Sequence, residues 1–187
     1  MSVKIISAIS SNGLIGKNGE LVVKNKLDMQ YFKEKTIGTK VMGMQNIVIM
    51  GRKTFESMGS KPLPKRKNVV ISSTKIDVSG VDTYSNLNEA IGYNTYKMIP
   101  RPEIWLIGGA AIYEEGMEYA DEIYLTVSKT KVEFTKEDAV ARFPVINPMI
   151  WGNPSMNVFY IPGYDKGDEF SRTDQDIALY TYKRSNA

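Results

Sequence analysis

Short apolar runs that alternate with amphipathic segments constrain the fold of this chain more than any other feature. The runs are rich in β-branched residues and have the length of strands. They lie at residues 3–9, 46–51, 68–74, 103–107 and 121–134. The segments with helical character lie at residues 25–36, 86–96 and 110–120, with a further short helix that Thr54 is expected to cap. Strands that alternate with helices in this way favour a parallel sheet.

The C-terminal third has a different pattern. Residues 143–170 carry Pro, Gly and Asn throughout, so we expect loops around one strand near residues 158–161. Residues 176–184 then close the chain as an alternating strand. The predicted fold is a single α/β domain over residues 1–187, built on a central, mostly parallel twisted sheet of about eight strands with flanking helices. Its C-terminal edge is expected to be antiparallel.

Two residue types are missing from the 187 residues, and their absence limits the chemistry. Without cysteine there is no disulfide framework, thiolate nucleophile or Cys-ligated zinc. Without histidine there is no Ser-His-Asp triad and no imidazole base. We expect no metal site, and, without these side chains, demanding chemistry would come from a bound cofactor.

Charge and hydropathy indicate a cytoplasmic protein. The net charge is only +3, and the one basic cluster, at residues 61–68, contains two prolines and is interpreted as a solvated turn. No apolar run approaches the roughly 20 residues that cross a bilayer, and the N-terminus does not resemble a signal peptide. We expect a small-molecule substrate, a monomer, and no nucleic-acid or membrane partner.

Two glycine-containing turns share one plan. The turns at residues 51–54 and 108–111 each follow an apolar strand and open a helix, whose free N–H groups suit phosphate. The first turn adds Arg52 and Lys53, and arginine suits a phosphate monoester. Ser73 and Thr74 end the next strand and offer hydroxyls to the same anion. Either turn alone is ordinary, but two on neighbouring strands favour a dinucleotide site.

Asp28 is the single carboxylate of the segment LVVKNKLDMQYF (21–32), and its sequence context allows two interpretations. Asn25 can cap a helix there, and Asp28 three residues later completes a pattern like a capping box. Alternatively, Asp28 is an acid in a binding site, because residues 28 and 32 share one face of a helix. Out of context the capping interpretation is favoured.

Taken in order, several strings resemble the dihydrofolate reductase family. They are ISAISSNGLIGKNGEL, LDMQYFKEKT, IVIMGRKTFESM, PLPKRKNVVISS, WLIGGAAIYEE and ADEIYLTV, and they cover roughly residues 3–130. The resemblance implies an oxidoreductase that transfers a hydride from NADPH to C6 of 7,8-dihydrofolate, giving tetrahydrofolate for thymidylate and one-carbon metabolism.

The resemblance also implies a substrate site. Asp28 matches the acid that pairs with N3 and the 2-amino group of the pterin, and Thr126 matches the hydroxyl that supports it; these are the expected catalytic residues. Arg66 matches the arginine that clamps the glutamate α-carboxylate. The apolar walls of the folate channel match Ile6, Ala8, Met29, Phe32, Met58, Leu63 and Ile107. The buried carboxylate would favour the pterin protonated at N5, while water delivers the proton.

The cofactor site is implied in the same way. The nicotinamide is expected against Ala8, Ile15 and Gly16. Residues that match the adenosine-phosphate side are Gly51, Arg52, Lys53, Thr54, Ser72 and Ser73. Residues that match the pyrophosphate turn and its helix are Gly108, Gly109, Ala110, Ala111, Ile112 and Tyr113.

Departures from the family pattern keep two alternatives open. The usual Pro-Trp pair before the acid is replaced by Val22 and Val23, and Val donates no side-chain hydrogen bond. Ala111 stands where many relatives place an arginine against the 2′-phosphate. The segment TKEDAVARFP (135–144) lacks the Gly-Asp pair that braces the neighbouring loop in relatives, and about seven extra residues precede Ile47. The alternatives are a pyrimidine-type reductase of the same fold, which lacks the acid, and a ligand-binding relative without catalysis.

Overall fold

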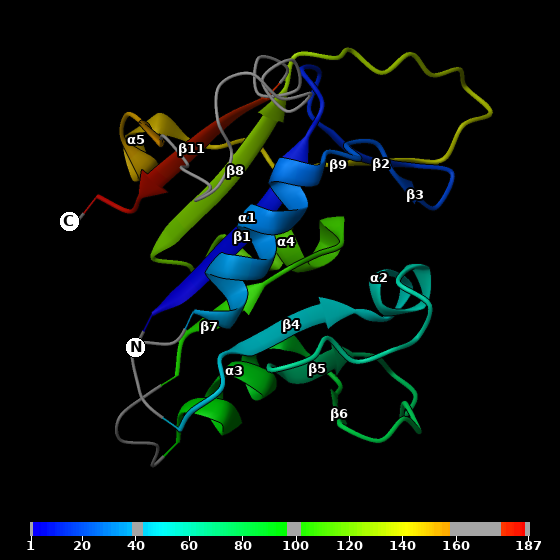
Figure 1. Cartoon of the computed structure of the whole chain (residues 1–187), viewed down its shortest axis with the longest axis vertical. Helices are drawn as coiled ribbons and strands as arrows, with labels where there is room; N and C mark the ends of the chain where they lie inside the picture. Colours follow the sequence, from blue (N-terminus) through cyan, green and yellow to red (C-terminus); the bar gives the residue numbers. More distant parts are fainter. Residues whose placement is uncertain (1, 39–42, 97–101, 158–176, 186–187) are drawn as a thin grey trace.

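The predicted central sheet is present. A computed structural model of the chain describes residues 2–38, 43–96, 102–157 and 177–185. Within these residues eight strands form one sheet in the order β10-β11-β8-β1-β7-β4-β5-β6 (Figure 1). The strands are β1 (Val3–Ile9), β4 (Ile47–Gly51), β5 (Lys67–Ile71), β6 (Val81–Tyr84), β7 (Ile104–Leu106), β8 (Glu122–Ser128), β10 (Ser155–Asn157) and β11 (Ile177–Lys183). Strands β8 to β6 pair in parallel, whereas β10 and β11 pair antiparallel, which confirms the predicted fold class.

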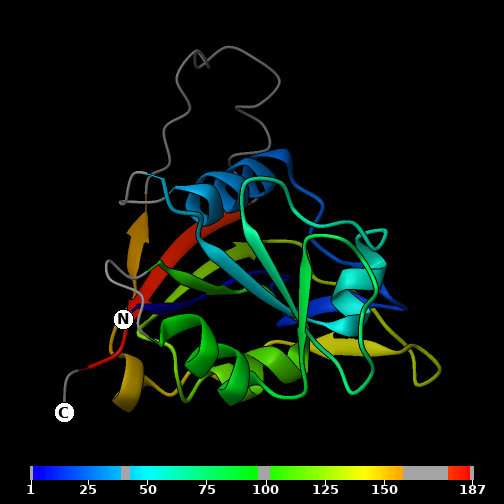
Figure 2. The same cartoon turned by 90° about the horizontal axis from the view of Figure 1, so that it is seen from below.

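Helices cover both faces of this sheet because successive strand residues point to opposite faces. Ile6 of β1 packs with Leu27 and Tyr31, whereas Ile5 packs in a separate core with residues of the opposite face. The first face carries α1 (Lys26–Ile37) and α2 (Arg52–Ser57), and the second carries α3 (Leu87–Thr95), α4 (Ala110–Gly116) and α5 (Pro148–Trp151). Figure 2 shows α1 on one side of the sheet and α3 and α4 on the other. The sheet therefore separates two apolar cores, one on the face of α1 and α2 and one on the face of α3, α4 and α5.

Two predicted strands are shorter in the structure. β5 ends at Ile71 because the hydroxyl of Ser72 accepts a hydrogen bond from the backbone N–H of Thr74 at 3.2 Å and turns the chain. β8 ends at Ser128 rather than Phe134, and the chain then leaves the sheet. Just beyond this end, the Thr130 carbonyl accepts a hydrogen bond from the Ser11 N–H at 3.0 Å. Both endings place polar side chains at the carboxyl edge of the sheet.

A second, three-stranded sheet was not predicted. It contains β2 (Leu14–Lys17), β3 (Glu20–Leu21) and β9 (Val140–Arg142) in the order β3-β2-β9. Asn18 and Gly19 join β2 to β3 with φ values of +52° and +83°, the backbone of a tight Asn-Gly hairpin turn. The Asn-Gly turn and the pairing of β2 with β9 therefore give residues 14–21 the form of a regular hairpin.

The remaining predictions differ in outcome. The strand expected near residues 158–161 lies outside the described residues, as do residues 39–42 of the long connection before Ile47. Trp151, in a segment predicted to be loop, is buried in the core of the second face. None of the helices in the described ranges has the length and apolar character needed to cross a bilayer.

Candidate active site

Asp28 lies in the first turn of α1 and does not cap it. Asn25 is the capping residue, because its Oδ1 accepts hydrogen bonds from the N–H groups of Leu27 at 2.8 Å and Asp28 at 3.2 Å. The Asp28 carboxyl faces the sheet, where the hydroxyl of Thr126 in β8 hydrogen-bonds to it. Burial raises the pKa of Asp28 above its ordinary value, and the Thr126 hydrogen bond offsets part of that increase. The structure thus brings together the two residues expected to be catalytic.

Most of the predicted apolar wall lies on the same face of the sheet as α1, the helix that carries this acid. Ile6 of β1 and Ile107, which follows β7, are buried in the same core cluster, and Phe32, Met58 and Leu63 pack against it. Ala8 lies beside Thr126, because these two residues are paired in the β1–β8 register. Met29 differs from the other predicted wall residues, since 68% of it is exposed. Most of the predicted folate channel therefore gathers on the α1 face, and Met29 lies at its outside.

Arg66 is a buried cation held by neutral partners. Its Nη1 donates to the Thr36 hydroxyl at 2.8 Å and its Nε to the Pro64 carbonyl at 3.0 Å. The guanidinium carbon lies 5.9 Å from the centre of the Phe32 ring, on the predicted substrate wall. Only 7% of Arg66 is exposed, and burial lowers its pKa, yet no carboxylate in the described part of the chain forms an ion pair with it. A buried guanidinium of this kind favours an external carboxylate.

The two glycine turns meet at neighbouring strands. The Gly51 N–H donates to the Gly108 carbonyl at 2.7 Å, and β4 is hydrogen-bonded to β7. A Cβ atom on Gly109 would lie 3.2 Å from the hydroxyl oxygen of Thr54, so the backbone here is open only because side chains are absent. Thr54 does not cap α2 as predicted; the helix begins at Arg52 after Gly51. These contacts bring both halves of the predicted dinucleotide site together.

The side chains that follow the second turn separate into two groups. Ile112 and Tyr113 are buried in the core, and the Tyr113 hydroxyl donates to the Ile6 carbonyl at 2.8 Å. Ala111 is exposed, whereas Ala110 packs against the core. Tyr113 thus ties the predicted pyrophosphate turn to the strand that carries the predicted substrate wall.

Gly108 is where this arrangement is most sensitive to substitution. Its φ is +115°, and a Cβ atom would lie 3.2 Å from the Tyr113 hydroxyl oxygen. We expect Gly108→Ala to lower the free energy of unfolding by ~1–3 kcal/mol and the melting temperature by several degrees. The matched control is Gly92→Ala in α3, where nothing lies within 4 Å, so a gain of about 0.5–1 kcal/mol is expected from helix propensity. Equal melting temperatures for the two variants in a thermal scan would contradict this interpretation.

Arg52 and three hydroxyl residues form the predicted phosphate end. The Arg52 Nη1 donates to the Thr74 hydroxyl at 3.2 Å, and the Thr74 and Ser72 hydroxyl oxygens are 3.3 Å apart. Ser73 and Lys53 are exposed at the same edge. The sequence did not reveal Glu56, whose Oε1 accepts a hydrogen bond from the Arg52 Nε at 2.7 Å. The sequence signal for this ion pair was the spacing of four residues between Arg52 and Glu56, which places both side chains on one face of a helix.

Comparison with known proteins decides the family. Residues 2–159 match the family model described as dihydrofolate reductase. A dihydrofolate reductase from Haemophilus influenzae is 32% identical over 183 residues, which cover 98% of this chain and 100% of that protein. The chain belongs to the dihydrofolate reductase family. The family was the leading hypothesis from the sequence, and it is confirmed.

Other members of the dihydrofolate reductase family align over the same length. The Bacillus subtilis enzyme is 31% identical over 186 residues, covering 99% of this chain and 96% of that protein. Among solved structures, the dihydrofolate reductase from Enterococcus faecalis complexed with NADP(H) and RAB-propyl has a TM-score of 0.74 at 26% identity. That alignment covers 99% of this chain and 97% of the Enterococcus chain. The likeness therefore extends over the whole fold.

The chain departs from the family pattern just before Asp28. Val23 is buried, and the Val22 N–H donates to the Ile15 carbonyl at 3.2 Å, which joins this segment to β2. Ile15, a predicted nicotinamide contact, is itself buried, and Gly16 pairs with Leu21 and Ala141 in the small sheet. The segment that usually carries a tryptophan donor is therefore held here by backbone pairing.

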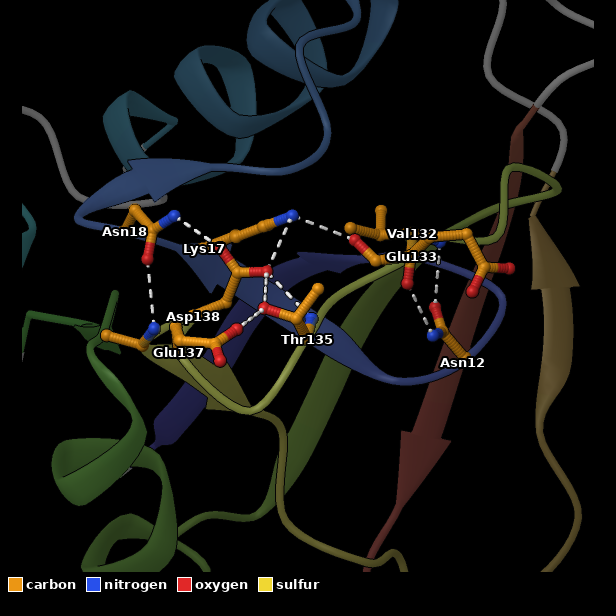
Figure 3. A network of polar contacts seen from close by, with 9 residues as sticks. Asn12, Lys17, Asn18, Val132, Glu133, Thr135, Glu137 and Asp138 are labelled. Atoms are coloured by element: carbon orange, nitrogen blue, oxygen red, sulfur yellow. Dashed lines mark hydrogen bonds and ion pairs between the residues drawn. The ribbon is translucent and has the colours of Figure 1, made fainter.

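The hairpin is tied to the segment of residues 132–139, although that segment lacks the usual Gly-Asp pair (Figure 3). Asp138 accepts a hydrogen bond from the Asn18 side chain at 2.7 Å and forms an ion pair with Lys17 at 3.1 Å. The Asn18 side chain in turn accepts from the Ala139 N–H at 2.9 Å. Asn12 exchanges two hydrogen bonds with the backbone of Val132, at 2.9 and 3.1 Å. This chain thus braces its hairpin with its own set of residues.

The contacts of Asp138 with Asn18 and Lys17 are expected to limit the motion of the hairpin. Hydrogen bonds from the Thr135 backbone and the Asn18 side chain, together with Lys17, hold the pKa of Asp138 well below its usual range. Because this pKa is depressed, the tie is intact at neutral pH and is lost only in strong acid. We expect Asp138→Asn to speed amide hydrogen exchange in residues 15–21 at pH 7 with little change in global melting temperature.

Glu133→Gln is the matched control for Asp138→Asn. This substitution removes the same charge from the same segment. The contact between Lys17 and Glu133 uses the backbone carbonyl of Glu133, so it does not depend on the Glu133 side chain. Its hairpin exchange rates should match those of the wild type. Unchanged exchange in Asp138→Asn would show that the hairpin does not depend on this carboxylate.

Proposed function

We infer that this chain catalyses the NADPH-dependent reduction of 7,8-dihydrofolate to tetrahydrofolate, and so supplies thymidylate and one-carbon metabolism. The observation that carries the inference is the half-buried Asp28 carboxyl, which is hydrogen-bonded to Thr126 on the face of the sheet that also carries the apolar cluster of Ile6 and Ile107. The reductases to which the chain is similar share the fold in which this acid is placed.

We propose that Asp28 binds and activates the pterin. Its two carboxylate oxygens accept hydrogen bonds from N3 and the 2-amino group, while Thr126 fixes the orientation of the carboxyl group. A carboxylate in a poorly solvated site stabilises a nearby cation strongly, so Asp28 favours the pterin that has taken a proton at N5 from solvent. That cation accepts a hydride at C6 more readily than the neutral ring does. Asp28 thus acts by charge stabilisation.

The other substrate residues would position the molecule. Ile6, Ala8, Phe32 and Ile107 would exclude water around the pterin and the benzoyl ring, with Met58 and Leu63 farther along the channel. Arg66 would bind the glutamate α-carboxylate, with Thr36 and Pro64 holding its guanidinium in place. Met29 is exposed, and its contact with substrate stays a prediction.

NADPH is the cofactor, and the residues present fit it. The backbone at Gly51, Gly108 and Gly109 lacks the Cβ atoms that would fill the space beside the pyrophosphate, and Arg52 with the nearby hydroxyls suits the 2′-phosphate. When bound, NADPH supplies the hydride. Ala8, Ile15 and Gly16 would orient the nicotinamide next to the pterin, while the remaining residues of α4 support the turn from the core.

Turnover of the purified protein tests this function. NADPH and 7,8-dihydrofolate are mixed with the protein, nicotinamide absorbance is followed, and tetrahydrofolate is identified by mass spectrometry. Oxidation of NADPH with formation of tetrahydrofolate is expected. NADPH binding without oxidation would favour the ligand-binding alternative, and oxidation only with a ribityl-amino pyrimidine would favour the other reductase.

We propose four further properties of the whole protein. These are the extent of the domain over residues 1–187, the monomeric state, the cytoplasmic location and the lack of nucleic-acid or membrane partners. They stay predictions, and size-exclusion chromatography with light scattering tests the monomeric state.

A further inference from the structure

The arginine at the phosphate end of the cofactor site is already engaged by a carboxylate. The Nε of Arg52 and the Oε1 of Glu56 are 2.7 Å apart, and both belong to α2. The side chains are 52% and 47% exposed, so solvent and salt screen the pair but do not remove it. The Arg52 Nη1 simultaneously contacts Thr74 at 3.2 Å.

This ion pair opposes the binding of a second anion at the same guanidinium. A phosphate monoester carries a charge of about −1.5 to −2 at neutral pH, so it is repelled by Glu56 while it is attracted by Arg52. A bare ribose hydroxyl carries no charge and experiences no such repulsion. Glu56 therefore penalises the phosphorylated dinucleotide selectively.

Glu56 is the one acidic residue that forms an ion pair with Arg52 in the described part of the chain. Ala111 offers no charge of its own, and the neighbouring Ser72 and Thr74 are neutral. Lys53 is exposed and forms no ion pair with any residue in the described ranges. The charged residues at this end of the site are Arg52, Lys53 and Glu56 in α2, with Lys75, an exposed residue, directly after Thr74.

We propose that Glu56 is a specificity-determining residue that reduces the preference of this enzyme for NADPH over NADH by competing with the 2′-phosphate for Arg52. The proposal rests on the proposed function, because it assigns the Arg52 end of the site to the adenosine phosphate. It extends that function to the discrimination between two cofactors.

Glu56→Gln separates the charge of this residue from its position. Glutamine keeps the length of the side chain and an oxygen that accepts from the Arg52 Nε, but it carries no charge. Dissociation constants for NADPH and NADH are measured by fluorescence titration without dihydrofolate. NADPH should bind about threefold to fivefold more tightly to the variant, with NADH unchanged, and the gain should shrink at high salt.

Asp82→Asn is the matched control. Asp82 forms a comparably exposed ion pair with Lys67 at 3.1 Å, near the amino ends of β5 and β6 and away from the glycine turns. The Asp82→Asn substitution removes the same charge as Glu56→Gln, so a general electrostatic effect on cofactor binding would appear in this variant too. The ratio of the NADPH and NADH dissociation constants should not change.

Two results would overturn the proposal. The first is weaker NADPH binding in Glu56→Gln, which would mean that Glu56 positions Arg52 favourably. The second is an unchanged ratio of the NADPH and NADH dissociation constants, whether neither cofactor or both bind more tightly. A wild-type protein that binds neither dinucleotide would overturn the proposed function itself. The binding data thus distinguish failure of the inference from failure of the function on which it rests.

Discussion

Asp28→Asn is expected to slow hydride transfer to 7,8-dihydrofolate by about 10²–10⁴-fold at pH 7, the usual contribution of a well-placed acid–base or charged group. Asparagine keeps the size of the side chain and the hydrogen bond with Thr126, but it removes the charge that stabilises the protonated pterin. The deficit should narrow as the pH falls, because solvent protonates more of the pterin without help from the enzyme. Stopped-flow measurement of NADPH oxidation across pH 5–9 tests both expectations.

The same substitution should stabilise the ligand-free protein. Burial raises the folded-state pKa of Asp28 above its ordinary value of 3.8, so the ionised carboxylate costs stability at neutral pH. The wild type is thus relatively more stable below the unfolded pKa, and it loses that advantage as the pH rises through the folded pKa. Thermal unfolding at pH 7 should therefore show a higher melting temperature for Asp28→Asn, with the difference vanishing in acid.

The control for this pair of effects is Asp77→Asn, at an exposed aspartate between β5 and β6. Neither the rate nor the melting temperature should change. An unaltered hydride-transfer rate in Asp28→Asn would show that the acid has been assigned wrongly. Loss of activity together with a lower melting temperature would point to a structural defect instead.

Arg66→Gln is expected to weaken dihydrofolate binding by about 10²-fold, which corresponds to ~3 kcal/mol for lost charge-assisted hydrogen bonds to a carboxylate. The loss should appear mainly in KM, because the glutamate that Arg66 is proposed to bind is at the opposite end of dihydrofolate from the reacting C6. Arg66→Lys should give an intermediate loss, since lysine keeps the charge but not the planar fork. Steady-state kinetics with saturating NADPH measures both variants.

The matched ligand for Arg66 is dihydropteroate, which has the pterin and benzoyl groups without the glutamate. Its KM should be the same for the wild type and both variants. An equal loss for the two substrates would mean that Arg66 supports the channel through Thr36 and the Phe32 ring rather than through the carboxylate.

Local sequence patterns predicted the main sheet because its strands are short runs rich in β-branched residues that alternate with helical segments. Val48 and Met50 alternate with Ile47 and Ile49 between the two cores, so β4 is apolar throughout, as a strand covered on both faces must be. Asn25 was correctly predicted to begin α1, because an amide side chain satisfies the free N–H groups of the first turn. The box-like role considered for Asp28 was not found, since tertiary contact with Thr126 determines where its carboxyl points.

Features that depend on distant partners were missed. β2 and β3 have four and two residues, too few for a periodic pattern, and they are ordered by β9 and by the Asn18–Asp138 contact across 120 positions. The ends of β5 and β8 were misplaced because the polar residues after Ile71 and Ser128 bond locally or to the loop at Ser11. Glu56 was missed because a surface glutamate has meaning only when the partner of Arg52 is known.

The Asp28 charge is expected to stabilise a cationic heterocycle, and the protonation state of a bound 2,4-diaminopyrimidine tests this role most directly. Ultraviolet difference spectra of the wild-type complex, recorded above the pKa of the free ligand, should show the protonated ring, whereas the Asp28→Asn complex should show the neutral ring. A neutral ring bound to the wild type with Asp28 ionised would contradict the account.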